Sequence, residues 1–139
     1  MRVNFSKMYC SCLPRTQQTA NIIESFLGKV PVEVSDLLDG GIPVAPDPPL
    51  PLFQYDPEVC ATQKKRLDQA FQKIFHRPSI VASSHNYEII ISHSTVIRYF
   101  ICKLLQIDPA TWERFFVPHC SISWVKILGN GVISIKSVG

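Results

Sequence analysis

The sequence predicts an α/β protein in which strands alternate with helices and build a layered sheet. Three observations predict this class. A short strand at residues 7–10 leads through a turn into a helix. An isoleucine-rich run at 88–92 leads into a second, amphipathic helix. Gly129-Asn130-Gly131 lies between two strand-like runs, a strong hairpin signal, so we expect an antiparallel edge to close the sheet.

The first strand is followed by a unit with clear helix signals. Pro14 suits the first helical turn, where the missing N–H would have no partner anyway, and Gly28 is typical of the residue just past a helix. We expect one buried stripe on this helix, made of Ala20, Ile23, Phe26 and Leu27. Residues 31–34 predict a second strand, with Val32 and Val34 on one side.

Residues 39–57 carry six of the eleven prolines, which excludes a helix or a central strand. We expect a loop packed on the body of the protein through Val44, Leu50, Leu52 and Phe53. A helix is predicted over 58–76, with the buried side Leu67, Ala70, Phe71, Ile74 and Phe75. Residues 77–86 read as a surface connection.

The isoleucine-rich run at 88–92 has the composition of a fully buried strand. Ser94 or Thr95 can cap the helix after it. Its predicted core residues are Val96, Ile97, Phe100, Ile101, Leu104 and Leu105. A short helix is expected over 109–116, followed by hairpin strands at 121–128 and 132–137.

Bulk composition narrows the classes of protein. A length of 139 residues suits one folded domain. A composition of 46% hydrophobic and 18% charged residues predicts a sizeable core. A net charge of +3 without a basic cluster that includes aromatic residues gives no support for nucleic acid binding. The chain has no apolar run near the ~18 residues that span a bilayer and no visible signal peptide. Five cysteines without framework spacing predict reduced thiols in an intracellular compartment.

Arg15 and His93 are the candidate functional residues. Each follows a strand at the turn that opens a helix, and in open α/β sheets the functional crevice lies beyond the carboxyl ends of the strands. Helix N-termini favour anions. A planar guanidinium and a titratable imidazole added there make a plausible phosphate pocket. From position alone, each residue also has a structural interpretation, because both types are common at helix starts and strand ends.

A cysteine phosphatase would need Cys, five residues and then Arg. Cys120 meets Lys126 at the required place, and Cys10 reaches Arg15 after only four residues, so the pattern fails twice.

Metal and nucleotide motifs are equally weak. A zinc site from the cysteines of 10–12 and the pair 119–120 has poor spacing. Gly40-Gly41 is followed by no glycine pattern or lysine of a nucleotide-binding loop. We therefore expect neither metal nor cofactor.

Longer segments carry a family resemblance. Cys12-Leu-Pro-Arg15-Thr-Gln-Gln-Thr-Ala20 and Ser92-His93-Ser-Thr-Val-Ile-Arg98 resemble the arginine-helix and second-histidine motifs of the histidine phosphatase (phosphoglycerate mutase-like) superfamily. Segments 36–43, 46–49 and 96–102 resemble a mitochondrial serine/threonine phosphatase within it. The similarity covers nearly the whole chain.

This resemblance implies a three-layer α/β/α fold and two-step phosphoryl transfer through a phosphohistidine, without metal or cofactor. Positioning and electrostatics would supply the catalysis. Arg15 matches a phosphate-binding arginine. His93 matches the second histidine, which is both catalytic and phosphate-binding. A phosphoprotein substrate or regulatory protein is the implied partner, and a homo-oligomer is possible.

Some expected parts are missing from the 139 residues. The nucleophilic Arg-His motif does not occur, so we expect a partial histidine phosphatase domain over 1–139 that lacks the family's first strand and helix. The family's acidic glutamate is Gly40 here, with Asp39 one position early as a candidate substitute. The usual asparagine near the last strand is His119.

Three functional hypotheses follow. The chain is part of an N-terminally truncated serine/threonine phosphatase and inactive as it stands; it is a non-catalytic binding or scaffold protein; or His93 is itself the nucleophile. The last leaves a phosphate dianion poorly neutralised. By resemblance, the location is mitochondrial, at the outer or inner membrane, with attachment through an N-terminal segment absent from these residues. Without that segment, we expect a cytoplasmic protein.

Overall fold

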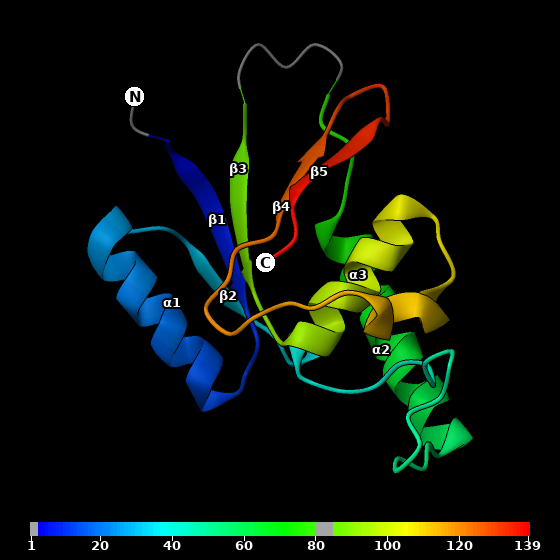
Figure 1. Ribbon diagram of the computed structural model, residues 1–139. Coiled ribbons are helices and arrows are strands. Elements are labelled where there is room, and N and C mark those ends of the chain that lie inside the picture. The colour runs from blue at the N-terminus through cyan, green and yellow to red at the C-terminus, as the bar shows by residue number, and fades with distance from the viewer. Residues whose placement is uncertain (1–2, 80–84) are drawn as a thin grey trace. The chain divides into compact units, whose positions relative to one another are not determined.

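The computed structural model describes residues 3–79 and 85–139 (Figure 1). The chain divides into two compact units, residues 1–40 with 83–93 and residues 41–82 with 94–139. We describe each unit separately. Parallel strands and helices confirm the predicted α/β class.

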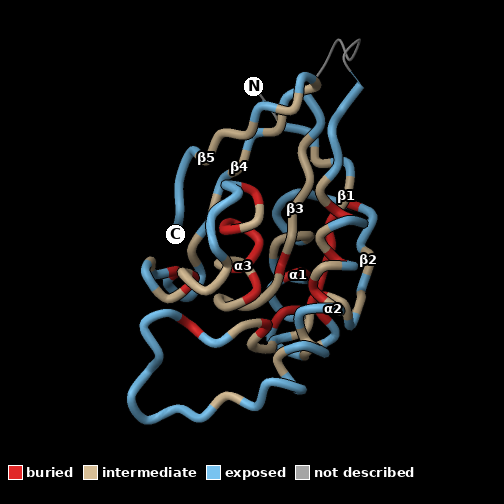
Figure 2. Tube along the Cα trace, turned by 90° about the vertical axis from the view of Figure 1, so that its right-hand side faces the viewer, coloured by how far each residue is buried: buried red, intermediate tan, exposed pale blue. Residues whose placement is uncertain are grey.

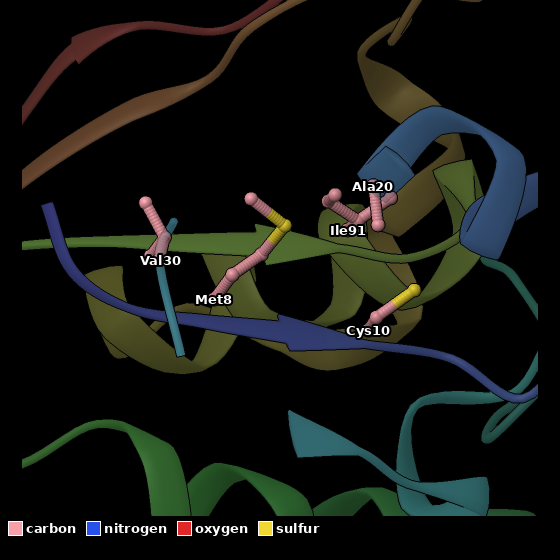
Figure 3. Close-up of a cluster of buried hydrophobic side chains, with 5 residues drawn as sticks. All are labelled: Met8, Cys10, Ala20, Val30 and Ile91. Atoms are coloured by element: carbon pink, nitrogen blue, oxygen red, sulfur yellow. The ribbon is translucent and has the colours of Figure 1, made fainter. Parts of the chain in front are cut away.

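The first unit is built on a three-stranded parallel sheet. Strands β1 (Phe5–Cys10), β2 (Val32–Val34) and β3 (Tyr87–Ile91) are ordered β2-β1-β3, with β1 in the middle. Figure 3 shows side chains of the core beside these strands and helix α1 (Pro14–Leu27). The buried cluster consists of Met8, Cys10, Ala20, Val30 and Ile91. The strands predicted at 7–10 and 31–34 and the helix that starts at Pro14 are therefore confirmed.

Only part of the predicted stripe of α1 is buried. Ala20 is 3% exposed and Ile23 is half-buried, whereas Phe26 is 84% and Leu27 44% exposed. The prediction was wrong for the last turn, because the sheet contacts the helix around Ala20. The helix ends where expected: Gly28 has φ +84° and its N–H donates to the Glu24 carbonyl.

Strand β3 is less buried than its composition predicted. Ile91 is buried, but the four residues from Tyr87 to Ile90 are half-buried. Among the described residues, β3 pairs only with β1, so it lies at a sheet edge. The predicted connection at 77–86 falls partly on residues 80–84, which lie outside the described residues.

The second unit packs helices α2 (Pro57–Ile74) and α3 (Ser94–Leu105) with the 3-10 helix η2 (Pro109–Arg114). The Asp56 carboxylate caps α2 by accepting from the N–H groups of Glu58 and Val59. Aromatic contacts join Phe71, Phe75 and Phe100. Much of α3 is coloured as buried in Figure 2. Its buried residues are Val96, Tyr99, Phe100, Ile101, Cys102 and Leu104. Leu105, predicted in this core, is 46% exposed, because it is the last residue of the helix.

The proline-rich segment has no helix or strand between residues 39 and 56, as predicted. Trp112 Nε1 donates to the Val44 carbonyl, and the Asp47 N–H donates to the Ala110 carbonyl. The segment is anchored there. The expected packing of Leu50, Leu52 and Phe53 was wrong: these side chains are 40%, 100% and 55% exposed.

The predicted hairpin forms from β4 (Trp124–Ile127) and β5 (Ile133–Ser137). Gly131, at φ +87°, occupies the turn, where glycine tolerates the left-handed backbone. The expectation that this hairpin closes the parallel sheet was wrong for the described residues, in which β4 and β5 form a two-stranded sheet of their own. Pairing between distant strands leaves no local signal.

None of the helices in the described part of the chain is both long and apolar enough to cross a membrane.

Candidate functional site

The candidate site lies in the first unit, at the carboxyl ends of its three parallel strands. Ser11 and Arg15 follow β1, Asp39 follows β2 through the short 3-10 helix η1 (Asp36–Leu38), and His93 follows β3. Because the strands are parallel, these ends meet at one edge of the sheet. The local turns are fixed by hydrogen bonds to backbone carbonyls: the Ser11 N–H donates to the Ile91 carbonyl, and the Ser92 hydroxyl donates to the Leu38 carbonyl.

The two residues singled out from the sequence meet. Arg15 Nη2 lies 2.9 Å from Nδ1 of His93. Arg15 is exposed and His93 is half-buried. The predicted proximity of a cation and a titratable ring is present in the structure, and their role in phosphate binding stays a prediction.

Ser11 is the residue that the sequence reading did not single out. It is 0% exposed, and its Oγ lies 2.9 Å from Nε2 of His93 and 2.6 Å from Oδ1 of Asp39. The Leu13 N–H also donates to this hydroxyl oxygen, at 3.2 Å. The available signal in the sequence was its position, because Ser11 directly follows the strand that leads to the Pro14-Arg15 start of the helix.

Asp39 is held by the turn after β1. Its Oδ1 accepts from the Ser11 hydroxyl and from the Cys12 N–H, the latter at 2.8 Å. A carboxylate held in this way stabilises the turn and brings a negative charge to the site. Whether Asp39 replaces the family's acid stays a prediction.

Gly40 lies beside the same imidazole. A Cβ added to Gly40 would be 3.4 Å from Cγ of His93, which is van der Waals contact without a clash. Position 40 is therefore close enough for a side chain to touch the ring.

The two thiols nearest this cluster are not activated. Burial raises the pKa of Cys10, and its Sγ donates to the Ser11 carbonyl. Desolvation together with the carboxylates of Asp39 and Asp36 raises the pKa of Cys12. Because the thiolate is the nucleophilic form, neither cysteine suits nucleophilic catalysis at neutral pH.

The remaining histidines have other surroundings. His85 makes an edge contact with the ring of Tyr87, and His76 Nδ1 lies 3.0 Å from the Ile74 carbonyl in the second unit. His119 is exposed. Within residues 3–79 and 85–139, no three His, Cys, Asp or Glu side chains gather as metal ligands would.

The parallel sheet carries an arginine and a histidine at its carboxyl edge, and family comparison gives the class of protein. Residues 51–138 match the histidine phosphatase superfamily (branch 1), and the chain belongs to that superfamily. A solved phosphoglycerate mutase from Plasmodium falciparum has a TM-score of 0.73 and 27% identity, covering 99% of this chain and 72% of that one. The phosphoglycerate mutase-like fold is thereby confirmed.

Two curated relatives carry the same name, serine/threonine-protein phosphatase Pgam5, mitochondrial. The Caenorhabditis briggsae protein is 40% identical over 139 residues, covering 99% of this chain and 49% of its own. The Xenopus tropicalis protein is 34% identical over 135 residues, covering 97% and 48%. The chain thus spans about half the length of these relatives. The predicted resemblance to a mitochondrial serine/threonine phosphatase is confirmed.

Proposed function

We propose that this chain supplies the phosphate-recognising edge of a serine/threonine phosphoprotein phosphatase, acting without metal or cofactor through a phosphohistidine. The observation that carries this proposal is the 2.9 Å contact between Arg15 Nη2 and His93 Nδ1 at the carboxyl edge of the parallel sheet. Arginine presents a planar set of donors that matches phosphate oxygens. The names of the relatives support the protein-phosphate substrate class and a mitochondrial location.

The phosphohistidine step needs a nucleophile that these 139 residues do not offer in the family's form. The sequence contains no Arg-His pair. His93 has Arg15 at Nδ1 and Ser11 at Nε2, so both ring nitrogens already have partners. We therefore assign His93 a stabilising role, in preference to the hypothesis that His93 is itself the nucleophile.

The test of phosphate recognition is a titration of the chain with inorganic phosphate, followed by calorimetry or NMR. We expect binding that weakens about tenfold or more in Arg15→Gln, because a hydrogen bond to a charged group contributes roughly 1.5–3 kcal/mol. Arg114→Gln is the matched control, since that exposed arginine contacts Asp47 in the second unit. Equal affinity in Arg15→Gln and the unmodified chain would contradict the proposal.

A binding or scaffold role is the second candidate, favoured by Gly40 at the place of the family's acid. Its partner would be a phosphorylated or regulatory protein. Turnover tests whether His93 acts as a nucleophile in this chain, which neither of these two functions predicts. We expect the purified 139 residues to bind phosphate but not to hydrolyse p-nitrophenyl phosphate or a phosphopeptide. Hydrolysis that disappears in His93→Ala would show that His93 can act alone.

A further inference from the structure

The hydroxyl of Ser11 has every hydrogen-bonding position filled. A serine hydroxyl donates once and accepts twice. Its proton goes to Oδ1 of Asp39, at 2.6 Å, because a carboxylate only accepts. One lone pair accepts from the Leu13 N–H. The remaining lone pair faces Nε2 of His93 at 2.9 Å, so the hydrogen in that contact belongs to the imidazole.

The other side of the ring leads to the same assignment. A guanidinium has five N–H donors and no acceptor. In the contact between Arg15 Nη2 and His93 Nδ1, Nδ1 must therefore accept. A neutral imidazole carries one proton, and both contacts place it on Nε2.

We propose that Ser11 is a positioning residue that, with Asp39, holds His93 as the neutral tautomer protonated at Nε2. The Nδ1 lone pair is then directed at the guanidinium of Arg15, an exposed residue. In this tautomer Arg15, in contact with Nδ1, supplies the N–H donors for the ligand of the proposed function, and His93 could donate to that ligand only after it takes up a second proton at Nδ1. The tautomer follows from the contacts alone; only the identity of the ligand on the Arg15 side rests on the proposed function.

Asp39 sets the direction of this chain of hydrogen bonds. Without an acceptor at Oδ1, the Ser11 hydroxyl could rotate and donate to Nε2, which would favour the opposite tautomer. The Cys12 N–H also donates to Oδ1 of Asp39, at 2.8 Å, and holds the carboxylate in place. The Asp39 carboxylate therefore orients the Ser11 hydroxyl, and the Ser11 hydroxyl in turn determines which nitrogen of His93 carries hydrogen.

The test is a two-bond ¹⁵N–¹H correlation spectrum of the chain labelled with ¹⁵N-histidine, recorded without phosphate. Protonated and unprotonated ring nitrogens differ widely in ¹⁵N shift. We expect His93 to show a protonated Nε2 and an unprotonated Nδ1. In Ser11→Ala and in Asp39→Ala, the ratio of the two tautomers should change by about two- to tenfold, the equivalent of one neutral hydrogen bond.

Two further variants make this result specific. Ser11→Thr keeps the hydroxyl and should retain the Nε2–H tautomer. Ser25→Ala removes a hydroxyl from the same unit that donates to the Ile22 carbonyl, and it should leave His93 unchanged.

A protonated Nδ1 in the unmodified chain would overturn the proposal, as would a wild-type tautomer ratio in a folded Asp39→Ala variant. The Asp39→Ala spectrum also answers the question if Ser11→Ala fails to fold. Phosphate is added last. If it does not shift the His93 signals, the proposed phosphate recognition fails, while the tautomer assignment stands.

Discussion

Asp68 shows how strongly a half-buried carboxylate of the second unit is tied to its neighbours. Lys64 Nζ lies 2.7 Å from its Oδ2, while Lys103 and the hydroxyl of the buried Tyr99 bind its Oδ1. Burial by itself would raise the pKa of Asp68, but the hydrogen bonds from Lys103, Lys64 and Tyr99 lower it to about 2. These contacts join α2 to α3.

We expect Asp68→Asn to lower the free energy of unfolding by roughly 1–2 kcal/mol at pH 7. The carboxyl has a lower pKa in the folded chain than in the unfolded one, so its contribution is complete above about pH 4. It disappears as the pH falls toward 2. Urea denaturation at several pH values checks this, and the variant and the unmodified chain should converge at low pH.

Glu58→Gln is the matched control for this prediction, because Glu58 is an exposed carboxylate on the same helix. Its effect should stay within about 0.5 kcal/mol, as for ordinary surface substitutions. A constant difference between Asp68→Asn and the unmodified chain from pH 7 to pH 2 would contradict the assigned role.

At the residue scale, the sequence predicted a meeting of Arg15 and His93 because both follow parallel strands. It did not predict the role of Ser11. Which nitrogen of the His93 ring faces the Ser11 hydroxyl depends on the exact placement of two segments that are 82 residues apart in the sequence. No pattern of residue types in the sequence encodes this placement.

At the element scale, α1 and β3 give a matched pair of large apolar residues with opposite surroundings. Ile91 is 8% exposed at the end of β3 and belongs to the core cluster, whereas Phe26 is 84% exposed on α1. We expect Ile91→Ala to lower the free energy of unfolding by about 2–4 kcal/mol through lost burial and a cavity.

Phe26→Ala should change the same free energy by no more than about 0.5 kcal/mol, since the larger side chain buries little. Chemical denaturation of both variants checks the pair. A comparable loss in Phe26→Ala would show that its ring is covered in solution.

Element types and most boundaries could be predicted from the sequence, because helix periodicity and turn residues are local signals. Pro14 and Gly28 gave both ends of α1. The extent of burial could not be predicted in this way. A stripe on a helix shows which side turns inward, but not where along its length the covering sheet ends, and Phe26 lies beyond that point.

At the scale of the whole molecule, strand order decides which backbone is protected. β1 is bonded on both sides, by β2 and β3, and the Met8 N–H donates to the Pro31 carbonyl at 2.8 Å. We expect the slowest amide hydrogen exchange of the first unit in β1, because central backbone opens only with larger parts of the fold. Native-state exchange followed by NMR measures this. Slower exchange in β2 than in β1 would contradict the strand order.

Strand order was also the part of the fold least accessible from the sequence. The hairpin at 124–137 was visible in Gly129-Asn130-Gly131, but its separation from the parallel sheet was not. Hairpin pairing is encoded by two adjacent turn residues, whereas the neighbours of β3 come from residues that are remote in sequence.

Gly40 has a consequence for the space beside the candidate site. A methyl group at this position would already touch Cγ of His93 at 3.4 Å, and any larger side chain would add further atoms near the ring. Glycine places nothing there. A methyl group would therefore pack against a ring that Ser11 and Arg15 already hold at its two nitrogens, while a longer side chain would have to share the space beside that ring.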